Sequence, residues 1–210
     1  MKIVVAPDKF KGSLPATQVA AAIAAGLHAG RPGAEVVTIP MADGGEGTVD
    51  AAVAAGFERV PVTAAGPAGD PVRSGYARRG EVAVVELAVL GATRRPGIEL
   101  VLDLAGFETA LDGADLVITG EGSLDAQSLA GKTPVGVARA AARRGTAVVA
   151  VAGRSTLREP ELAAAGIAAV YALSDLEPDL KRCRAEAARL LRRIGQMIAR
   201  DRLAEVVTGA

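Results

Sequence analysis

The sequence has few of the residues that build disulfides, zinc sites and base-stacking surfaces. One cysteine, Cys183, excludes an internal disulfide and is typical of a protein in a reducing compartment. One histidine, His28, is too few for a zinc site made of His and Cys ligands. Three Phe, two Tyr and no Trp leave little aromatic surface on which nucleic-acid bases could stack.

Net charge and long apolar runs are absent as well. The 24 basic and 24 acidic residues cancel, so the chain lacks the basic excess of a nucleic-acid-binding surface. No apolar run approaches the roughly 18 residues of a membrane span. The first apolar run is too short for a signal peptide, because Pro7 and Asp8 interrupt it. We therefore expect a cytoplasmic protein without nucleic-acid or membrane partners.

Lysine is rare in this arginine-rich chain, and its positions are uneven. Three of the lysines lie in polar loops that also contain glycine, namely Lys9, Lys11 and Lys132. The lysine ammonium is a compact point charge that suits phosphate or a developing negative charge, and arginine does not replace it freely there. The lysine positions therefore point to those loops as candidate anion sites.

The order of apolar runs predicts an α/β fold. Strands expected at residues 2–6, 35–39, 116–118, 147–151 and 168–173 alternate with helical patterns. This rhythm is typical of a doubly wound, mostly parallel sheet with helices on both faces, formed here as a single domain over residues 1–210. Residues 72–78 and 82–87 interrupt this alternation and predict a small β-hairpin. Residues 174–177 read as a capping box that opens the longest helix.

Three polar loops follow expected strands, at residues 8–13, 43–48 and 119–133. The last begins where the strand at residues 116–118 is expected to stop, at Thr119 and Gly120. In an open α/β sheet, such loops meet at the carboxyl edge of the strands, where ligands bind. Carboxylates that hold Mg²⁺, with lysines and helix N-termini that neutralise phosphate, are the groups that phosphoryl transfer needs. The loops supply Asp8, Asp43, Glu46, Glu121 and Asp125 together with Lys9, Lys11 and Lys132.

Each loop also has an ordinary explanation. The run DGGEG can be a tight turn whose glycines supply positive φ, and Asp8 with Lys9 can be a solvated pair. The run AQSLAGKT, from Ala126 to Thr133, fits a relaxed P-loop pattern, but the expected strand ends eight residues before it, whereas a P-loop follows its strand directly. Neither a G-x-G-x-x-G motif nor a nucleophile elbow is present.

Three motifs, VVAPDKFKGSL, PMADGGEGT and DLVITGEGSLDAQSLAGKTPVGVA, resemble the bacterial glycerate kinase family in the family's own order. The resemblance implies transfer of phosphate from ATP, with Mg²⁺, to D-glycerate, giving 2-phosphoglycerate in the cytoplasm. It also implies a glycerate site built from the residues of the motifs. Lys9 stands where many members have serine.

The resemblance carries site roles to individual residues. It implies catalytic roles for Asp43, Glu121 and Lys132, and Asp43 and Glu121 are also the expected metal ligands. Lys11 and Lys132 are expected to contact phosphate. The expected substrate- and phosphate-binding residues are Asp8, Lys11, Gly44, Gly45, Glu46, Thr48, Gly120 and Asp125.

The chain departs from the family in one respect. Family members carry an inserted domain with a further glycine-rich motif, and nothing here matches it, so residues 1–90 and 92–210 match two halves of the family's first domain. The seam falls at about residues 89–95. Three readings follow: a kinase that works in shortened form, a non-catalytic module that keeps an anion or metal site, and a domain merely left by a deletion. Exposed apolar residues at the seam, Val89 and Leu90, would favour a homo-oligomer.

Overall fold

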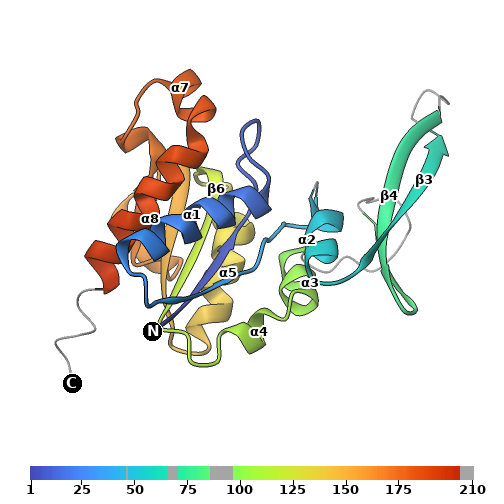
Figure 1. Ribbon diagram of the computed structural model, residues 1–210, viewed down its shortest axis with the longest axis horizontal. Coiled ribbons are helices and arrows are strands. Elements are labelled where there is room, and N and C mark those ends of the chain that lie inside the picture. Colours follow the sequence, from blue (N-terminus) through green and yellow to red (C-terminus); the bar gives the residue numbers. More distant parts are fainter. Residues whose placement is uncertain (46, 66–70, 86–96, 204–210) are drawn as a thin grey trace.

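A computed structural model describes residues 1–45, 47–65, 71–85 and 97–203 of the chain. Its main sheet has five strands in the order β2-β1-β6-β7-β8, and every neighbouring pair is parallel. Apolar, β-branched runs form these strands, and β6 lies at the centre between β1 and β7 (Figure 1). The strands are β1 (Lys2–Pro7), β2 (Glu35–Thr38), β6 (Leu116–Leu124), β7 (Ala147–Ser155) and β8 (Ala169–Ala172).

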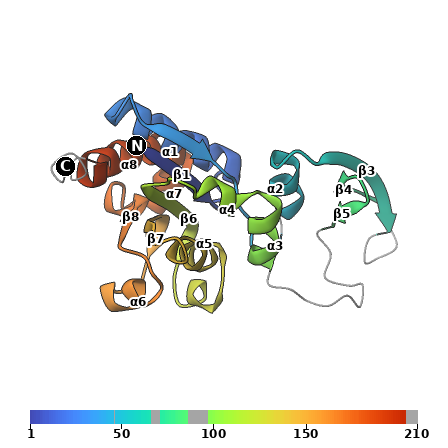
Figure 2. The ribbon, with the colours of Figure 1, turned by 90° about the horizontal axis from the view of Figure 1, so that it is seen from below.

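Helices cover both faces of this sheet, as Figure 2 shows. Alternate residues of β1 point to opposite faces, so Ile3 and Val5 pack with α1 (Ala16–Gly30) and α8 (Ala187–Leu203). Val4 and Ala6 pack with α3 (Gly97–Leu104), α4 (Phe107–Ala110) and α5 (Thr133–Ala142). The predicted doubly wound α/β architecture is confirmed.

A second, antiparallel sheet lies to one side of the first, with α2 (Thr48–Ala54) and α3 between the two (Figures 1 and 2). It consists of β3 (Glu58–Ala65), β4 (Pro71–Arg79) and β5 (Val82–Val84) in that order. It has a small apolar cluster of its own with α2, in which Phe57 and Ala77 are buried. The predicted hairpin is confirmed, with its turn at Gly80, where φ is 59°.

The strand β6 is longer than the sequence predicts. It does not stop at Thr119 but continues to Leu124, because β7 runs beside it up to the pair Leu124 with Ser155. Gly120 makes this possible, since a Cβ there would collide with the carbonyl oxygen of Val151. Glu121 is therefore held in a strand, opposite Ala152, and not in a loop.

The predicted capping box at residues 174–177 is wrong. Residues Leu173–Asp175 form a single 3₁₀ turn, η2, and the next helix, α7 (Leu180–Ala185), is capped by Asp179. One carboxylate oxygen of Asp179 accepts hydrogen bonds from the N–H groups of Lys181 and Arg182 at 2.9 and 3.0 Å. The consequence is a short separate helix, α7, that lies above the carboxyl edge of the sheet (Figure 1). A further short helix, α6 (Glu159–Ala164), follows β7.

Among the described residues, none of the helices has the length and apolar character needed to cross a membrane.

Candidate functional site

A polar hollow of about 840 Å³ opens at the carboxyl edge of the sheet. The segments that follow β1 and β2, the ends of β6 and β7, the start of α5 and the helix α7 surround it. The sequence-predicted residues that it brings together are Asp8, Lys11, Asp43, Glu121, Asp125 and Lys132. The three predicted loops therefore do meet at one edge, as parallel strands require.

Glycine lets the backbone segments approach one another beneath this hollow. A Cβ at Gly122 would lie 3.2 Å from the backbone nitrogen of Lys11, which is tighter than ordinary contact. A side chain there would push apart the end of β6 and the segment after β1. The predicted binding residue Gly120 acts in the same way, through its close contact with β7, and does not line the hollow.

Asp8 is fixed by hydrogen bonds on both carboxylate oxygens. Oδ2 accepts from the hydroxyl of Thr133 at 2.8 Å, and Oδ1 accepts from the N–H of Lys9 at 2.6 Å. Burial raises the pKa of Asp8 above its usual value, the two hydrogen bonds oppose that rise, and the charge of nearby Asp43 adds to it. The carboxyl group is therefore oriented, half-buried and close to a second acid.

Glu121 has the most unusual environment in the hollow. Burial raises its pKa to about 6, against the favourable effects of the Ser128 hydroxyl and the Lys132 ammonium. Its Oε1 atom is buried and has no hydrogen-bond partner among the described residues. A buried carboxylate oxygen without a partner is costly, so it points to a ligand that would supply the missing contact.

The DGG turn after β2 presents Asp43 at the rim of the hollow. Gly44 has φ of 93° and packs directly on the backbone of Gly97, at the start of α3. The N–H of Gly45 donates to Oδ1 of Asp43 at 3.3 Å, and the Thr48 hydroxyl donates to the carbonyl of Gly45 at 2.7 Å. Gly44, Gly45 and Thr48 thus shape the turn without lining the hollow. Glu46, also predicted for this site, lies outside the described residues.

The segment after β6 is not a phosphate-cradling P-loop. Such a loop needs backbone N–H groups that point at the ligand, whereas here the segment's own oxygens accept them. The N–H of Gln127 donates to the Asp125 carboxylate at 2.9 Å, and that of Asp125 donates to the Ser128 hydroxyl at 3.1 Å. The N–H groups of Ser128, Ala130, Gly131 and Lys132 bond backbone carbonyls within the segment, which contains the 3₁₀ turn η1 (Ser128–Ala130).

Two arginines that the sequence patterns did not identify as site residues line the hollow. Arg154, near the end of β7, donates from Nε to the Ser123 hydroxyl at 3.2 Å, and Ser123 donates in turn to Asp125 at 3.2 Å. This holds the guanidinium by one edge, and within the described residues its two terminal nitrogens have no hydrogen-bond partner. Arg184 approaches from α7, whose backbone accepts a hydrogen bond from Ser13 at 2.9 Å. A polar residue just past a strand end is the signal that would have found Arg154.

The described residues contain no group of three or more His, Cys, Asp or Glu side chains that could hold a metal ion. The charges of Asp8 and Asp43 interact, and those of Asp8 and Asp125 act on Glu121. A pair of carboxylates is nonetheless the donor set with which Mg²⁺ is commonly held, since substrate phosphates and water complete its shell.

Comparison with known proteins agrees with this geometry. The sequence profile of the Glycerate kinase family matches residues 3–90 and 87–203. The chain belongs to the glycerate kinase family. Its two matched segments meet at residues 87–90 and include every described residue of the polar hollow.

Individual family members resemble parts of the chain. Glycerate 2-kinase of Escherichia coli is 45% identical over 105 residues, which are 48% of this chain and 26% of that protein. Glycerate kinase of Halalkalibacterium halodurans is 51% identical over 67 residues, 32% of this chain and 18% of its own length. The matched segments thus span about a quarter or less of these relatives.

The fold is also found in a solved structure. The putative glycerate kinase 2 of Salmonella typhimurium aligns with a TM-score of 0.73 and 22% identity, over 99% of this chain and 99% of that chain. At 22% identity this similarity shows the fold alone, and it is consistent with the parallel sheet described above.

Proposed function

We propose that this protein is an ATP-dependent kinase that phosphorylates D-glycerate and yields 2-phosphoglycerate. The observation that carries the proposal is the unpartnered, buried Oε1 of Glu121 in a hollow that also holds Lys132 and the oriented Asp8. The family membership and the names of the similar proteins support the same reaction. A non-catalytic binding module, the other reading of the sequence, is not favoured by these relatives.

Glu121 is the proposed general base. With a pKa raised to about 6 it is mostly ionised at neutral pH, yet it binds a proton more readily than an ordinary glutamate. It would take the proton of the glycerate hydroxyl as that oxygen bonds to the terminal phosphorus. The bond from phosphorus to the bridging oxygen breaks, and its electron pair leaves with ADP. Activity should therefore fall as the pH drops through about 6.

The lysines are the proposed phosphate contacts. Lys132 stands at the start of α5 and acts electrostatically on Glu121, so it lies where the transferred phosphate would approach the base. Lys11 lies within the segment after β1 and is an exposed residue that lines the hollow. Two ammonium groups beside a phosphate would stabilise the charge that spreads over its oxygens in the transition state.

A magnesium ion fits the remaining acids. Of the two predicted metal ligands we keep Asp43 and pair it with Asp8, because the Glu121 carboxylate is needed as a base. When bound with ATP, Mg²⁺ would neutralise phosphate charge. Burial raises the pKa of Asp8 most and repulsion by Asp43 adds to the rise, so a cation between the two carboxylates would offset that repulsion. A cytoplasmic location, where ATP is supplied, belongs to the same proposal.

We further propose that the chain lacks the family's inserted domain. The two profile matches meet at residues 87–90, close to the predicted seam at residues 89–95. An open hollow admits water, so we expect slow transfer with some direct hydrolysis of ATP. Self-association at the seam through Val89 and Leu90 stays a prediction, because both residues lie outside the described part of the chain.

The test is release of ADP from Mg-ATP with and without D-glycerate, with the product's phosphate position read by NMR. We expect glycerate-dependent turnover that Glu121→Gln abolishes. The matched control is Glu159→Gln, an exposed glutamate at the start of α6 and outside the hollow. A folded wild-type protein without glycerate-dependent turnover would exclude the kinase reading and leave the binding module.

A further inference from the structure

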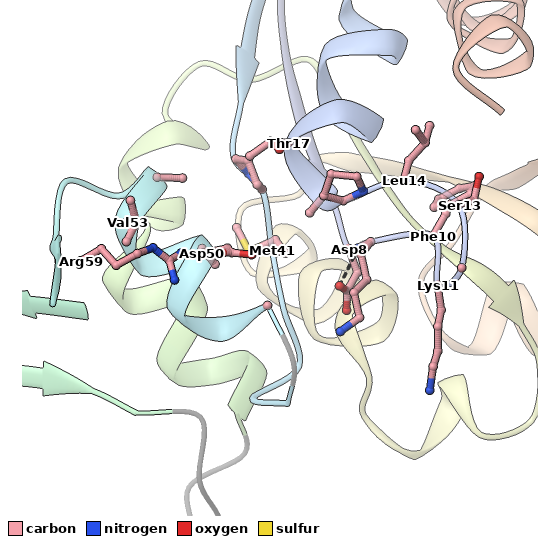
Figure 3. A pocket seen from close by; sticks show the side chains of 18 residues that line it. Asp8, Phe10, Lys11, Ser13, Leu14, Thr17, Met41, Asp50, Val53 and Arg59 are labelled. Carbon is pink, nitrogen blue, oxygen red and sulfur yellow. Dashed lines mark hydrogen bonds and ion pairs between the residues drawn. The ribbon is translucent and has the colours of Figure 1, made fainter. Parts of the chain in front are cut away.

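A second hollow lies on the other side of the segment after β1. Its volume is about 650 Å³, and we call it the apolar hollow. Figure 3 shows Phe10 and Leu14 on one side of it and Val53 on α2 on the other. Met41 and Thr17 also line it. Of the predicted site residues within the described part of the chain, Asp8 and Lys11 line this hollow, and both belong to the segment that also lines the polar hollow.

The side chains that belong to the apolar hollow alone are mostly uncharged. Its lining beyond the shared segment consists of Leu, Pro, Ala, Thr, Met, Gly and Val residues and one charged pair, Asp50 with Arg59. The guanidinium of Arg59 bonds the carboxylate of Asp50, so these two charges neutralise each other (Figure 3). Outside the shared segment, the walls are thus mostly apolar and their charges balance, which suits an uncharged, flat ring more than a phosphate or a small acid.

The two hollows share one wall. Residues 8–13 line both of them, and Lys11 belongs to that wall. The same wall leads into α1, a helix of 15 residues whose N-cap is Pro15 and which lacks a side-chain cap. A phosphate chain that runs from one hollow to the other would thus pass a lysine and the positive end of a helix.

The volumes of the apolar and polar hollows are consistent with one large ligand that occupies both. At about 650 Å³, the apolar hollow is within the range of roughly 300–1,000 Å³ that is usual for small-molecule sites. The polar hollow holds the general base and the acids, so it has the groups for the reacting ends of both substrates. A kinase also needs a place for the uncharged end of its nucleotide. The apolar residues of the polar hollow, Phe10, Leu173, Leu180, Cys183 and Ala187, are outnumbered by its nine charged residues. These are Asp8, Lys9, Lys11, Asp43, Glu121, Asp125, Lys132, Arg154 and Arg184.

We propose that the apolar hollow binds the base and ribose of the nucleoside triphosphate, and that the polar hollow receives its terminal phosphate and the acceptor acid. This assignment rests on the proposed kinase function and adds the location of the nucleotide. It predicts that Thr17 on α1 and Ala54 on α2 face the nucleoside from two sides of the hollow. Both are exposed, so larger side chains at these positions would enter the hollow without disturbing the core.

The experiment uses the absence of tryptophan from the chain. Thr17→Trp places a single fluorophore in the apolar hollow, and Gln18→Trp places one beside it on α1, exposed and outside both hollows. Each protein is titrated with Mg-ADP at equilibrium, with emission as one readout and calorimetry as the other. Ala54→Trp approaches the same space from α2 and replaces Thr17→Trp if that variant does not fold.

We expect the emission of Thr17→Trp to change as Mg-ADP binds, and the affinity of Thr17→Trp and Ala54→Trp for Mg-ADP to fall by about tenfold, because the added ring fills the hollow. Gln18→Trp should bind as the wild type does and show no emission change. The KM for D-glycerate should stay within about twofold in all three variants, since the acceptor lies in the other hollow.

Unchanged Mg-ADP affinity in both hollow variants would overturn the assignment and leave the kinase proposal intact. An equal emission change in Gln18→Trp would also overturn it, because the signal would then not be local to the hollow. Failure of the wild-type protein to bind Mg-ADP at all would instead contradict the kinase function itself.

Discussion

The hydroxyl of Thr133 donates a hydrogen bond of 2.8 Å to Oδ2 of Asp8, across 125 residues of sequence. Thr133 begins α5 and is completely buried, whereas Asp8 directly follows β1 and lines both hollows. The bond therefore joins two separate segments at the carboxyl edge and sets the direction of a site carboxylate. Removing it tests whether the orientation of Asp8 matters.

Thr133→Val keeps the shape of the side chain and removes the donor. We expect a loss of about 1–3 kcal/mol in the free energy of unfolding, measured by urea denaturation at pH 7, because a half-buried carboxylate loses a partner. The pKa of Asp8 should rise further, since the lost bond favours the charged form. Thr133→Ser is the control that keeps the donor, and it should retain most of the stability. A Thr133→Val protein as stable as the wild type would show that the hydrogen bond to Asp8 adds no stability.

Glu121 should make the protein less stable as the pH rises. Its pKa is about 6 in the folded state against 4.5 for the free group, so the folded state binds the proton more tightly. The contribution of Glu121 to the free energy of unfolding is greatest below pH 4.5 and declines as the pH rises through about 6, by about 2 kcal/mol in total.

The measurement is the difference in unfolding free energy between wild type and Glu121→Gln from pH 4 to pH 8. We expect the free energy of unfolding of the variant to rise relative to that of the wild type between pH 4.5 and about 6, and the difference to stay constant at higher pH. Taking the difference cancels the contribution of the other carboxyl groups. A difference that does not vary with pH would contradict the burial of the charge.

Gly120→Ala should destabilise the sheet, because the new Cβ would collide with the backbone carbonyl of Val151. We expect a loss of about 1–3 kcal/mol or more, as for an overpacked core position, since neither strand can move aside. Gly33→Ala is the control: it is exposed, has no positive φ and has nothing within 4 Å of its Cβ position. Thermal unfolding followed by circular dichroism would separate the two. A Gly120→Ala protein as stable as the control would mean that β6 and β7 separate at that point.

Arg154 should recognise the carboxylate of the acceptor. Its Nε is held by Ser123, so the two terminal nitrogens could bind a carboxylate side by side, which a lysine cannot do. Under the proposed function, Arg154→Lys should raise the KM for D-glycerate by about 10- to 100-fold, the loss of one charged hydrogen bond, and leave the KM for ATP unchanged.

The matched control is Arg158→Lys, because Arg158 follows the same strand but is 80% exposed and pairs with Glu161 outside the hollow. Steady-state kinetics with both substrates varied would show the effect. A similar rise in the KM values for D-glycerate and ATP, or no rise in either, would show that Arg154 does not recognise the acceptor.

Local sequence patterns predicted the strands of the main sheet because each is a short apolar run, and parallel strands bring their following segments to one edge. That reasoning correctly placed Asp8, Asp43, Glu121 and Lys132 around one hollow. It failed at Thr119 and Gly120, which look like the start of a loop. Pairing with β7 extends the strand there, and that pairing depends on residues far along the chain.

Other features depend on contacts that no local pattern contains. The hydrogen bond between Gly45 and Thr48 that shapes their turn is one such contact. Arg154 becomes part of the hollow only because β7 ends beside Ser123. The division of the site into two hollows arises because residues 8–13 line one hollow together with α2 and the other together with α7, which is a property of the whole fold.

Because residues 8–13 form the wall between the two hollows, ligands on its two faces cannot be thermodynamically independent if either one orders that wall. A nucleotide that fixes the wall would lower the entropic cost of binding the acid by some factor. Linkage then requires the acid to tighten nucleotide binding by the same factor. One segment of six residues would in this way give the protein positive cooperativity between unlike ligands, without any change in the rest of the fold.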